Sequence, residues 1–214
     1  MTFFMTIDFL SPDESFIRSH LTPLVSELKA QGLAVRLFGR HEDLTEGDVL
    51  FILGYLRIVP KSRLALHQNN IVVHASDLPQ GKGWSPMPWQ IVEGRNDIIF
   101  TLFEAVAEVD AGPYYEKRCL HLNGTELFDE WKALQSEMVV NMIRSFLASY
   151  PKMEAKKQEG QESIYRKRTR DDDRLDVKQP LEILFDHIRV CDPDRYPAWF
   201  ELRGRKYKLS LAPL

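Results

Sequence analysis

Two hydrophobic periodicities alternate along the first half of the chain. Continuous apolar runs predict buried strands, and apolar residues that recur every three or four positions predict helices. Strands that alternate with helices at this interval are typical of a doubly wound α/β domain with a Rossmann-like, mostly parallel sheet. The predicted strands are 5–10, 33–38, 48–54 and 70–74, and the predicted helices are 16–31 and 61–67.

The second half of the chain predicts one long helix and a small C-terminal α+β extension. A Gly/Pro/Trp-rich loop at 79–88 is followed by a short helix, a strand and an antiparallel strand, and then by the longest helical face of the sequence. The segment 153–176 has almost no aliphatic side chains, so we expect a solvated connector or an ordered loop there. We therefore divide the chain into a domain of residues 1–152 and a unit of residues 153–214. The predicted elements are a helix at 89–93, strands at 98–103 and 114–122, helices at 127–150 and 181–190, and a hairpin at 199–211.

Composition narrows the class of protein. Apolar residues make up 44% of the chain and charged residues 28%, which is ordinary for a globular domain. The net charge of −3 argues against bulk nucleic acid as a partner. No apolar run reaches the roughly 18 residues of a membrane span, and the opening MTFFMTIDFL has no basic residue before it. We therefore expect a cytoplasmic chain whose opening segment is a buried strand and which has no membrane partner.

Most of the common catalytic signatures are absent. The sequence has no GxxxxGK[ST], no GxGxxG after the first strand, no HExxH and no GxSxG. The six histidines show no metal-ligand spacing, so we expect no metal ion. Cys119 and Cys191 lie far apart and are expected to be packed thiols.

Two residues remain as a candidate acid–base pair. His74 ends a predicted strand, where ligands bind in open α/β sheets, and Asp110 follows a later strand in an Asp-Ala-Gly turn. Such a pair can meet in space and move protons. On spacing alone, a structural histidine and a simple turn-forming aspartate explain the same pattern.

The residues around this pair resemble a known family. His74, Ser76, Leu78 and Pro79, then Lys82 and Gly83, and then Asp110 and Gly112 follow the order of the pattern Asn-x-His-x-Ser-x-Leu-Pro, Arg/Lys-Gly and Asp-x-Gly. This order resembles the folate-dependent formyltransferase family, and 55–60 looks like its folate-loop segment. The C-terminal stretch from Arg168 resembles that of the sugar and tRNA members.

The resemblance implies a reaction and a set of ligands. N10-formyltetrahydrofolate would donate a formyl group to a primary amine, with His74 and Asp110 as the catalytic residues. Residues expected to bind this co-substrate are Leu53, Gly54, Tyr55, Ile58, Val106 and Asp110. Three segments, HASDLPQGKGWSPMPWQI, IYRKRTRDDD and RYPAWFELRGRKY, look most like sugar N-formyltransferases of the pseudaminic acid pathway. This resemblance implies a nucleotide-linked amino sugar, UDP-4-amino-4,6-dideoxy-N-acetyl-altrosamine, as acceptor.

Residue chemistry suggests how an acceptor with a diphosphate would be held. Lys82 and Arg168 can neutralise phosphate, and Trp84 and Tyr165 can stack on a base or sugar, with Ser76 added from the motif. The alternative is that the run RKRTRDDDR is an exposed, self-compensating charge cluster. The apolar face of the long helix is compatible with a homodimer and equally with a helix that covers the sheet.

One departure from the family pattern leaves other functions open. Val72 stands where the family has an asparagine that helps to hold the formyl oxygen, and loss of such a donor costs about 10²–10³ in rate. A folate- or sugar-binding relative with impaired catalysis is therefore one alternative. A methionyl-tRNA formyltransferase-like enzyme is another.

Overall fold

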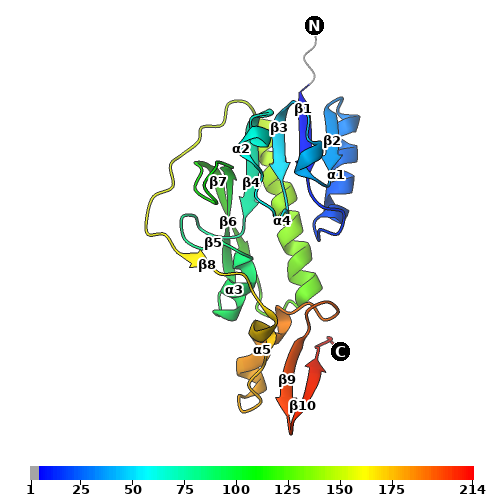
Figure 1. The fold of residues 1–214 in the computed structure, drawn as a ribbon, viewed down its shortest axis with the longest axis vertical. Helices are drawn as coiled ribbons and strands as arrows, with labels where there is room; N and C mark the ends of the chain where they lie inside the picture. The colour runs from blue at the N-terminus through cyan, green and yellow to red at the C-terminus, as the bar shows by residue number, and fades with distance from the viewer. Residues whose placement is uncertain (1–4) are drawn as a thin grey trace.

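A six-stranded sheet forms the centre of the computed structural model, which describes residues 5–214 (Figure 1). The strand order is β2-β1-β3-β4-β6-β7, with parallel pairing from β2 to β4 and antiparallel pairing of β6 and β7. The predicted α/β fold with a mostly parallel sheet is confirmed. The strands are β1 Thr6–Leu10, β2 Ala34–Phe38, β3 Gly47–Ile52, β4 His67–His74, β6 Asp97–Glu104 and β7 Tyr114–His121.

Both faces of the sheet bury apolar side chains because residues alternate between the faces along each strand. On one face, Phe9 and Phe51 stack at a ring-centroid distance of 5.3 Å, and the helices α1 (Arg18–Ala30) and α4 (Phe128–Ser149) contribute to the same core. On the other face, Leu10 and Leu50 pack with Leu44, which follows the short segment η1 (His41–Asp43), and with Leu64 of α2 (Lys61–Leu64). This two-sided burial explains why β3 reads as an uninterrupted apolar run.

The loop after β4 contains the short strand β5 (Lys82–Gly83) and the helix α3 (Pro86–Val92). The helix predicted at 89–93 begins three residues earlier, at Pro86. Pro86 begins the helix because a proline in the first turn has a suitable φ and loses no hydrogen bond there. The first residues of the chain, 1–4, which belong to the opening segment considered above, lie outside the described residues.

The segment that follows α4 is an ordered strap (residues 153–169). It passes outside β7 and returns to β5, where its strand β8 (Ile164–Tyr165) pairs in parallel with β5 (Figure 1). Arginines and aspartates of 166–173 then pair with one another, as in Arg166 with Asp172 and Arg168 with Asp173. This observation favours the self-compensating interpretation of the charge run.

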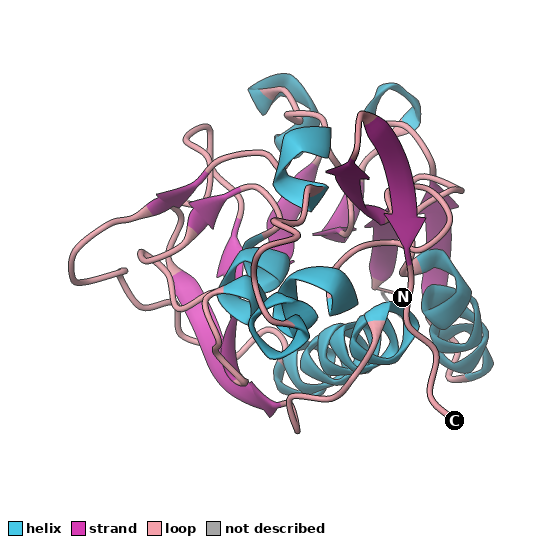
Figure 2. Ribbon diagram, turned by 90° about the horizontal axis from the view of Figure 1, so that it is seen from below, coloured by secondary structure: helices cyan, strands magenta, loops and turns pink. Residues whose placement is uncertain are grey.

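The chain ends in a small unit at the opposite end of the molecule from the start of β1. It consists of η2 (Arg170–Asp173), α5 (Leu181–Arg189) and the hairpin β9 (Ala198–Leu202) and β10 (Arg205–Leu209), and Figure 2 views the molecule from this end. The predicted helix and hairpin are confirmed. None of the helices within residues 5–214 has the length and apolarity of a membrane span.

Candidate active site

The structure brings His74 and Asp110 together at the carboxyl end of β4. Nε2 of His74 lies 3.8 Å from Oδ2 of Asp110, and the two side chains are only 10% and 12% exposed. Nε2 also lies 2.9 Å from the carbonyl oxygen of Gly81, which can only accept, so Nε2 carries a hydrogen and donates it there. Asp110 Oδ2 accepts a hydrogen bond of 2.8 Å from the backbone N–H of Gly83. The pair is thus held close, without a direct hydrogen bond between the two side chains.

The turn that carries Asp110 requires the residues found in it. Asp110 has a φ of 54°, in the left-handed region that aspartate tolerates better than most residues. A side chain on Gly112 would place its Cβ 1.7 Å from the carbonyl oxygen of Glu104. Glycine is therefore needed at 112 for this turn to pack against the end of β6, and the packing fixes where Asp110 points.

The strap holds the loop that contacts both catalytic candidates. Ser163 Oγ accepts a hydrogen bond of 2.8 Å from the N–H of Gly81, and Gln158 Nε2 donates to the carbonyl oxygens of Asp110 and Gly112. A Cβ on Gly83 would lie 2.4 Å from the carbonyl oxygen of Tyr165, so the pairing of β5 with β8 also depends on a glycine. The strap therefore fixes the backbone segments next to His74 and Asp110.

A cavity of about 390 Å³ opens in front of this pair. This volume falls within the range of small-molecule sites, about 300–1,000 Å³. The cavity wall includes His74 and Asp110 and every residue that the resemblance assigns to the co-substrate. Those residues are Leu53, Gly54, Tyr55, Ile58 and Val106, together with Asp110.

Of the residues expected to bind the acceptor, some lie in the cavity wall and others lie outside it. Trp84 lies in the cavity wall, whereas Ser76 and Lys82 are buried and are not part of that wall. The ammonium of Lys82 pairs with Glu162 at 2.6 Å, so its charge is already compensated.

Tyr165 and Arg168 lie on the strap, outside the cavity wall. Tyr165 donates to Glu93 and stacks on Trp89, and the guanidinium of Arg168 lies 5.1 Å from the same indole and pairs with Asp173. Burial and the neighbouring Glu93 carboxylate raise the pKa of Tyr165 to about 12. The role of these residues in acceptor binding stays a prediction.

Lys132 is a cavity residue that the sequence analysis missed. Its Nζ lies 3.9 Å from the ring centroid of Phe16 and 4.6 Å from that of Trp131, and it donates to Gln135 Oε1 at 3.2 Å. Burial lowers the pKa of Lys132 to about 8. One side of α4 carries Phe128, Lys132, Gln135 and Val139. The same helical spacing that predicts the core therefore places the ammonium of Lys132 in the cavity.

Val72 lies in the cavity wall on the same face of β4 as His74, two residues away. The nearby asparagines do not replace the missing amide. Asn69 Nδ2 donates to Glu104 and Tyr115, and Asn70 Nδ2 donates to the carbonyl oxygen of Leu64. The cavity wall therefore has an apolar side chain at the position where the resemblance implies an asparagine.

Comparison with known proteins finds similar sequences among the methionyl-tRNA formyltransferases. No family model matches the chain. The methionyl-tRNA formyltransferase of Listeria welshimeri is 28% identical over 171 residues, which are 77% of this chain and 54% of that protein. The chain thus spans about half the length of the curated relatives it matches.

Solved structures show the same fold. Methionyl-tRNA formyltransferase from Clostridium thermocellum superposes with a TM-score of 0.84 at 20% identity, covering 98% of this chain and 93% of that one. A sugar N-formyltransferase from Shewanella sp FDAARGOS_354 gives a TM-score of 0.73 at 13% identity and 97% coverage of both chains. HypX from Aquifex aeolicus in complex with tetrahydrofolic acid gives 0.79 at 20% identity, covering 97% of this chain and 37% of that one.

The structural neighbours show that this chain has the α/β fold of the formyltransferases. In sequence it is similar to methionyl-tRNA formyltransferases, and its structural neighbours also include sugar N-formyltransferases.

Proposed function

We propose that this chain transfers a formyl group from N10-formyltetrahydrofolate to the primary amine of a nucleotide-linked amino sugar. The observation that carries the proposal is the placement of His74 and Asp110, 3.8 Å apart and nearly buried, in the wall of a cavity of about 390 Å³. A general acid and a general base that converge on one cavity are what amine formylation requires.

The cavity suits the flat, partly apolar co-substrate. Leu53, Gly54 and Tyr55 follow the carboxyl end of β3, and Ile58 and Val106 extend the wall on either side. The side chains of Ile58 and Val106 are exposed at 74% and 42%, so they offer apolar surface that a pterin or aminobenzoyl ring can cover. The co-substrate supplies the formyl carbon, and the protein supplies orientation and proton transfer.

His74 and Asp110 have separate roles in this reaction. As the amine attacks the formyl carbon, negative charge develops on the formyl oxygen, and the imidazole of His74 stabilises it. Collapse of this tetrahedral intermediate breaks the bond between the formyl carbon and N10, and tetrahydrofolate leaves as N10 takes up the proton released by the amine. Asp110 keeps the imidazole oriented and accepts the proton that leaves the amine, directly or through a water molecule. Neither side chain needs to form a covalent bond with the substrate.

A small acceptor is favoured over a large polyanion. The chain carries a net charge of −3, and the arginines of 166–170 are paired with aspartates. A sugar N-formyltransferase is among the structural neighbours, with 97% of both chains covered. We propose UDP-4-amino-4,6-dideoxy-N-acetyl-altrosamine as the acceptor, with Trp84 against its sugar or base and with Lys82, Ser76, Tyr165 and Arg168 supporting the loop that faces its diphosphate.

A methionyl-tRNA acceptor is the second candidate. Its support is that the curated relatives are methionyl-tRNA formyltransferases and that one solved example superposes with a TM-score of 0.84. This candidate predicts a steep loss of affinity with added salt, because tRNA binding releases counterions from the phosphates that the protein neutralises. A nucleotide sugar with two phosphates has a much smaller salt dependence.

The experiment is a turnover assay with the two acceptors side by side. Purified chain is incubated with N10-formyltetrahydrofolate and either a panel of UDP-linked amino sugars or methionyl-tRNA, and release of tetrahydrofolate is followed spectrophotometrically. Turnover with one sugar and none with tRNA supports the proposal, and the reverse result supports the second candidate. Folate binding without turnover on any amine would assign the chain to a binding protein that lost catalysis with the asparagine at 72.

A further inference from the structure

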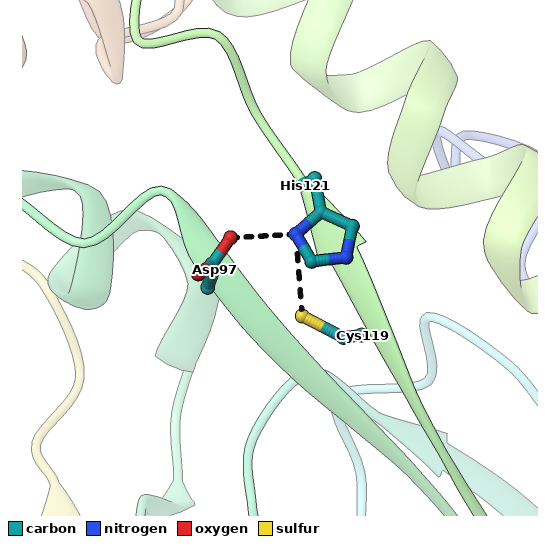
Figure 3. Close-up of side chains that lie close together, drawn as sticks. All are labelled: Asp97, Cys119 and His121. Atoms are coloured by element: carbon teal, nitrogen blue, oxygen red, sulfur yellow. Dashed lines mark hydrogen bonds and ion pairs between the residues drawn. The ribbon is translucent and has the colours of Figure 1, made fainter.

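Three metal-ligating side chains meet on the outer part of the sheet, away from the cavity. Asp97 begins β6, and Cys119 and His121 lie near the end of β7, the edge strand that pairs with β6 (Figure 3). His121 Nδ1 lies 2.6 Å from Asp97 Oδ1 and 3.8 Å from Cys119 Sγ. One ligand atom from each residue falls within 4.8 Å of the other two.

The antiparallel ladder explains why these three side chains converge. Asp97 and His121 are directly opposed in the register of β6 and β7, and Cys119 is two residues before His121 on the same face of its strand. The backbone that positions them is therefore a paired sheet rather than a loop. A site on regular strands is already organised before a ligand arrives.

The donor set has the chemistry of a transition-metal site. Imidazole nitrogen, thiolate sulfur and carboxylate oxygen are the three ligand types that Zn²⁺ takes from proteins. In a tetrahedral zinc site, bond lengths of about 2.0–2.3 Å put nitrogen and sulfur about 3.6 Å apart and nitrogen and oxygen about 3.3 Å apart. The observed 3.8 Å between His121 and Cys119 already fits, and Asp97 must withdraw by less than 1 Å from its hydrogen bond to the imidazole.

We propose that Asp97, Cys119 and His121 form a binding site for a divalent zinc ion with water as its fourth ligand. The side chains of Asp97 and His121 are each 74% exposed, so solvent reaches the fourth position. The thiol of Cys119 loses its proton to solvent when a metal–sulfur bond forms, because the thiolate is the ligand.

The proposed site is separate from formyl transfer. Asp97 lies four residues along β6 from Thr101, the partner of His74 in the sheet, which corresponds to about 13 Å of strand. None of the three ligands lies in the cavity wall. The proposal differs from the expectation of no metal ion drawn from the sequence. Cys119 and His121 on β7 alone are too few ligands, and the third ligand, Asp97, comes from β6 and is not visible from spacing along the chain.

The test is zinc binding by the full, reduced and metal-free chain, measured by competition with a chromophoric chelator. The expected result is one Zn²⁺ per chain, with Cys119→Ser and His121→Ala each weakening the affinity by more than about tenfold, since even partners outside the ligand shell are worth that much. His20→Ala is the matched control, because this histidine on α1 lies beside Ser19 Oγ, outside the proposed ligand set, and its loss should leave zinc binding unchanged. Circular dichroism checks that each variant is folded.

Cobalt gives a second readout that depends on the sulfur ligand. Co²⁺ bound at this site should show a thiolate-to-metal charge-transfer band in the near ultraviolet, and Cys119→Ser should remove it. An adventitious ion only, seen as equal affinity in the parent chain and in all three variants, or a cobalt spectrum without this band would overturn the proposal.

Discussion

Restoring the missing amide at position 72 is the sharpest perturbation that the site suggests. Val72 and His74 face the same side of β4 and both lie in the cavity wall. An asparagine at 72 would present its N–H₂ beside the imidazole, where the formyl oxygen becomes negative. We therefore expect Val72→Asn to raise kcat rather than lower it.

The size of the gain follows from two opposing contributions. One oxyanion donor contributes about 2.7–4 kcal/mol to transition-state stabilisation. Ordering a newly introduced side chain costs about 0.5–1.5 kcal/mol. The difference, about 1.2–3.5 kcal/mol, corresponds to an increase in kcat of about tenfold to a few hundredfold.

The assay is steady-state release of tetrahydrofolate by the parent chain and by Val72→Asn, with the acceptor that supports turnover. Val72→Asp is the matched control, because its ionised side chain has the shape of asparagine but only accepts hydrogen bonds. Unfolding in denaturant checks that each variant is stable. An unchanged or lower kcat in Val72→Asn, in a folded protein, would refute the assignment of this wall position to the formyl oxygen.

Three further perturbations test other parts of the site. Asp110→Asn keeps a group that can accept the Gly83 N–H but loses the negative charge, so kcat should fall by about 10²–10⁴ with little change in fold; a near-normal rate would remove Asp110 from the mechanism. Gly112→Ala should lower the free energy of unfolding by about 1–3 kcal/mol and reduce kcat. The Cβ of the new alanine would lie 1.7 Å from the Glu104 carbonyl oxygen and force the Asp110 turn to move. Unchanged values in denaturant unfolding and turnover would show that the turn is not constrained. Lys132→Met should raise the free energy of unfolding at pH 7. This stabilisation should shrink as pH rises from about 8 to 10.5, because in that window the unfolded chain retains the lysine proton while the folded chain has released it. A stabilisation that stays constant with pH in denaturant unfolding would contradict the lowered pKa of Lys132.

The sequence predicts those parts of the fold that a local pattern determines. The apolar run of β3 and the helical periodicity of α1 and α4 identify these elements because each pattern reports burial directly. The position of His74 at the end of β4 follows from the same argument. The start of α3 was misplaced because the proline that begins it also fits the loop before it.

Contacts between distant segments were beyond the sequence patterns. The strap has no aliphatic periodicity, yet backbone pairing of β8 with β5 and the hydrogen bond from Gly81 N–H to Ser163 Oγ order it against the site. Lys132 reads as an ordinary polar residue of an amphipathic helix until the cavity is seen beside it. Asp97 and His121 are brought together only by the register of β6 and β7, which spacing along the chain does not encode.

We propose that His74 and the cavity beside it perform formyl transfer to an amine. The most direct measurement is release of tetrahydrofolate from N10-formyltetrahydrofolate with the UDP-linked altrosamine precursor, by the parent chain and by His74→Gln. We predict turnover by the parent chain, formation of one formylated sugar per tetrahydrofolate released, and a loss of at least about 10² in kcat for a folded His74→Gln variant. Equal rates for the two proteins, or folate binding without transfer to any amine offered, would contradict this assignment.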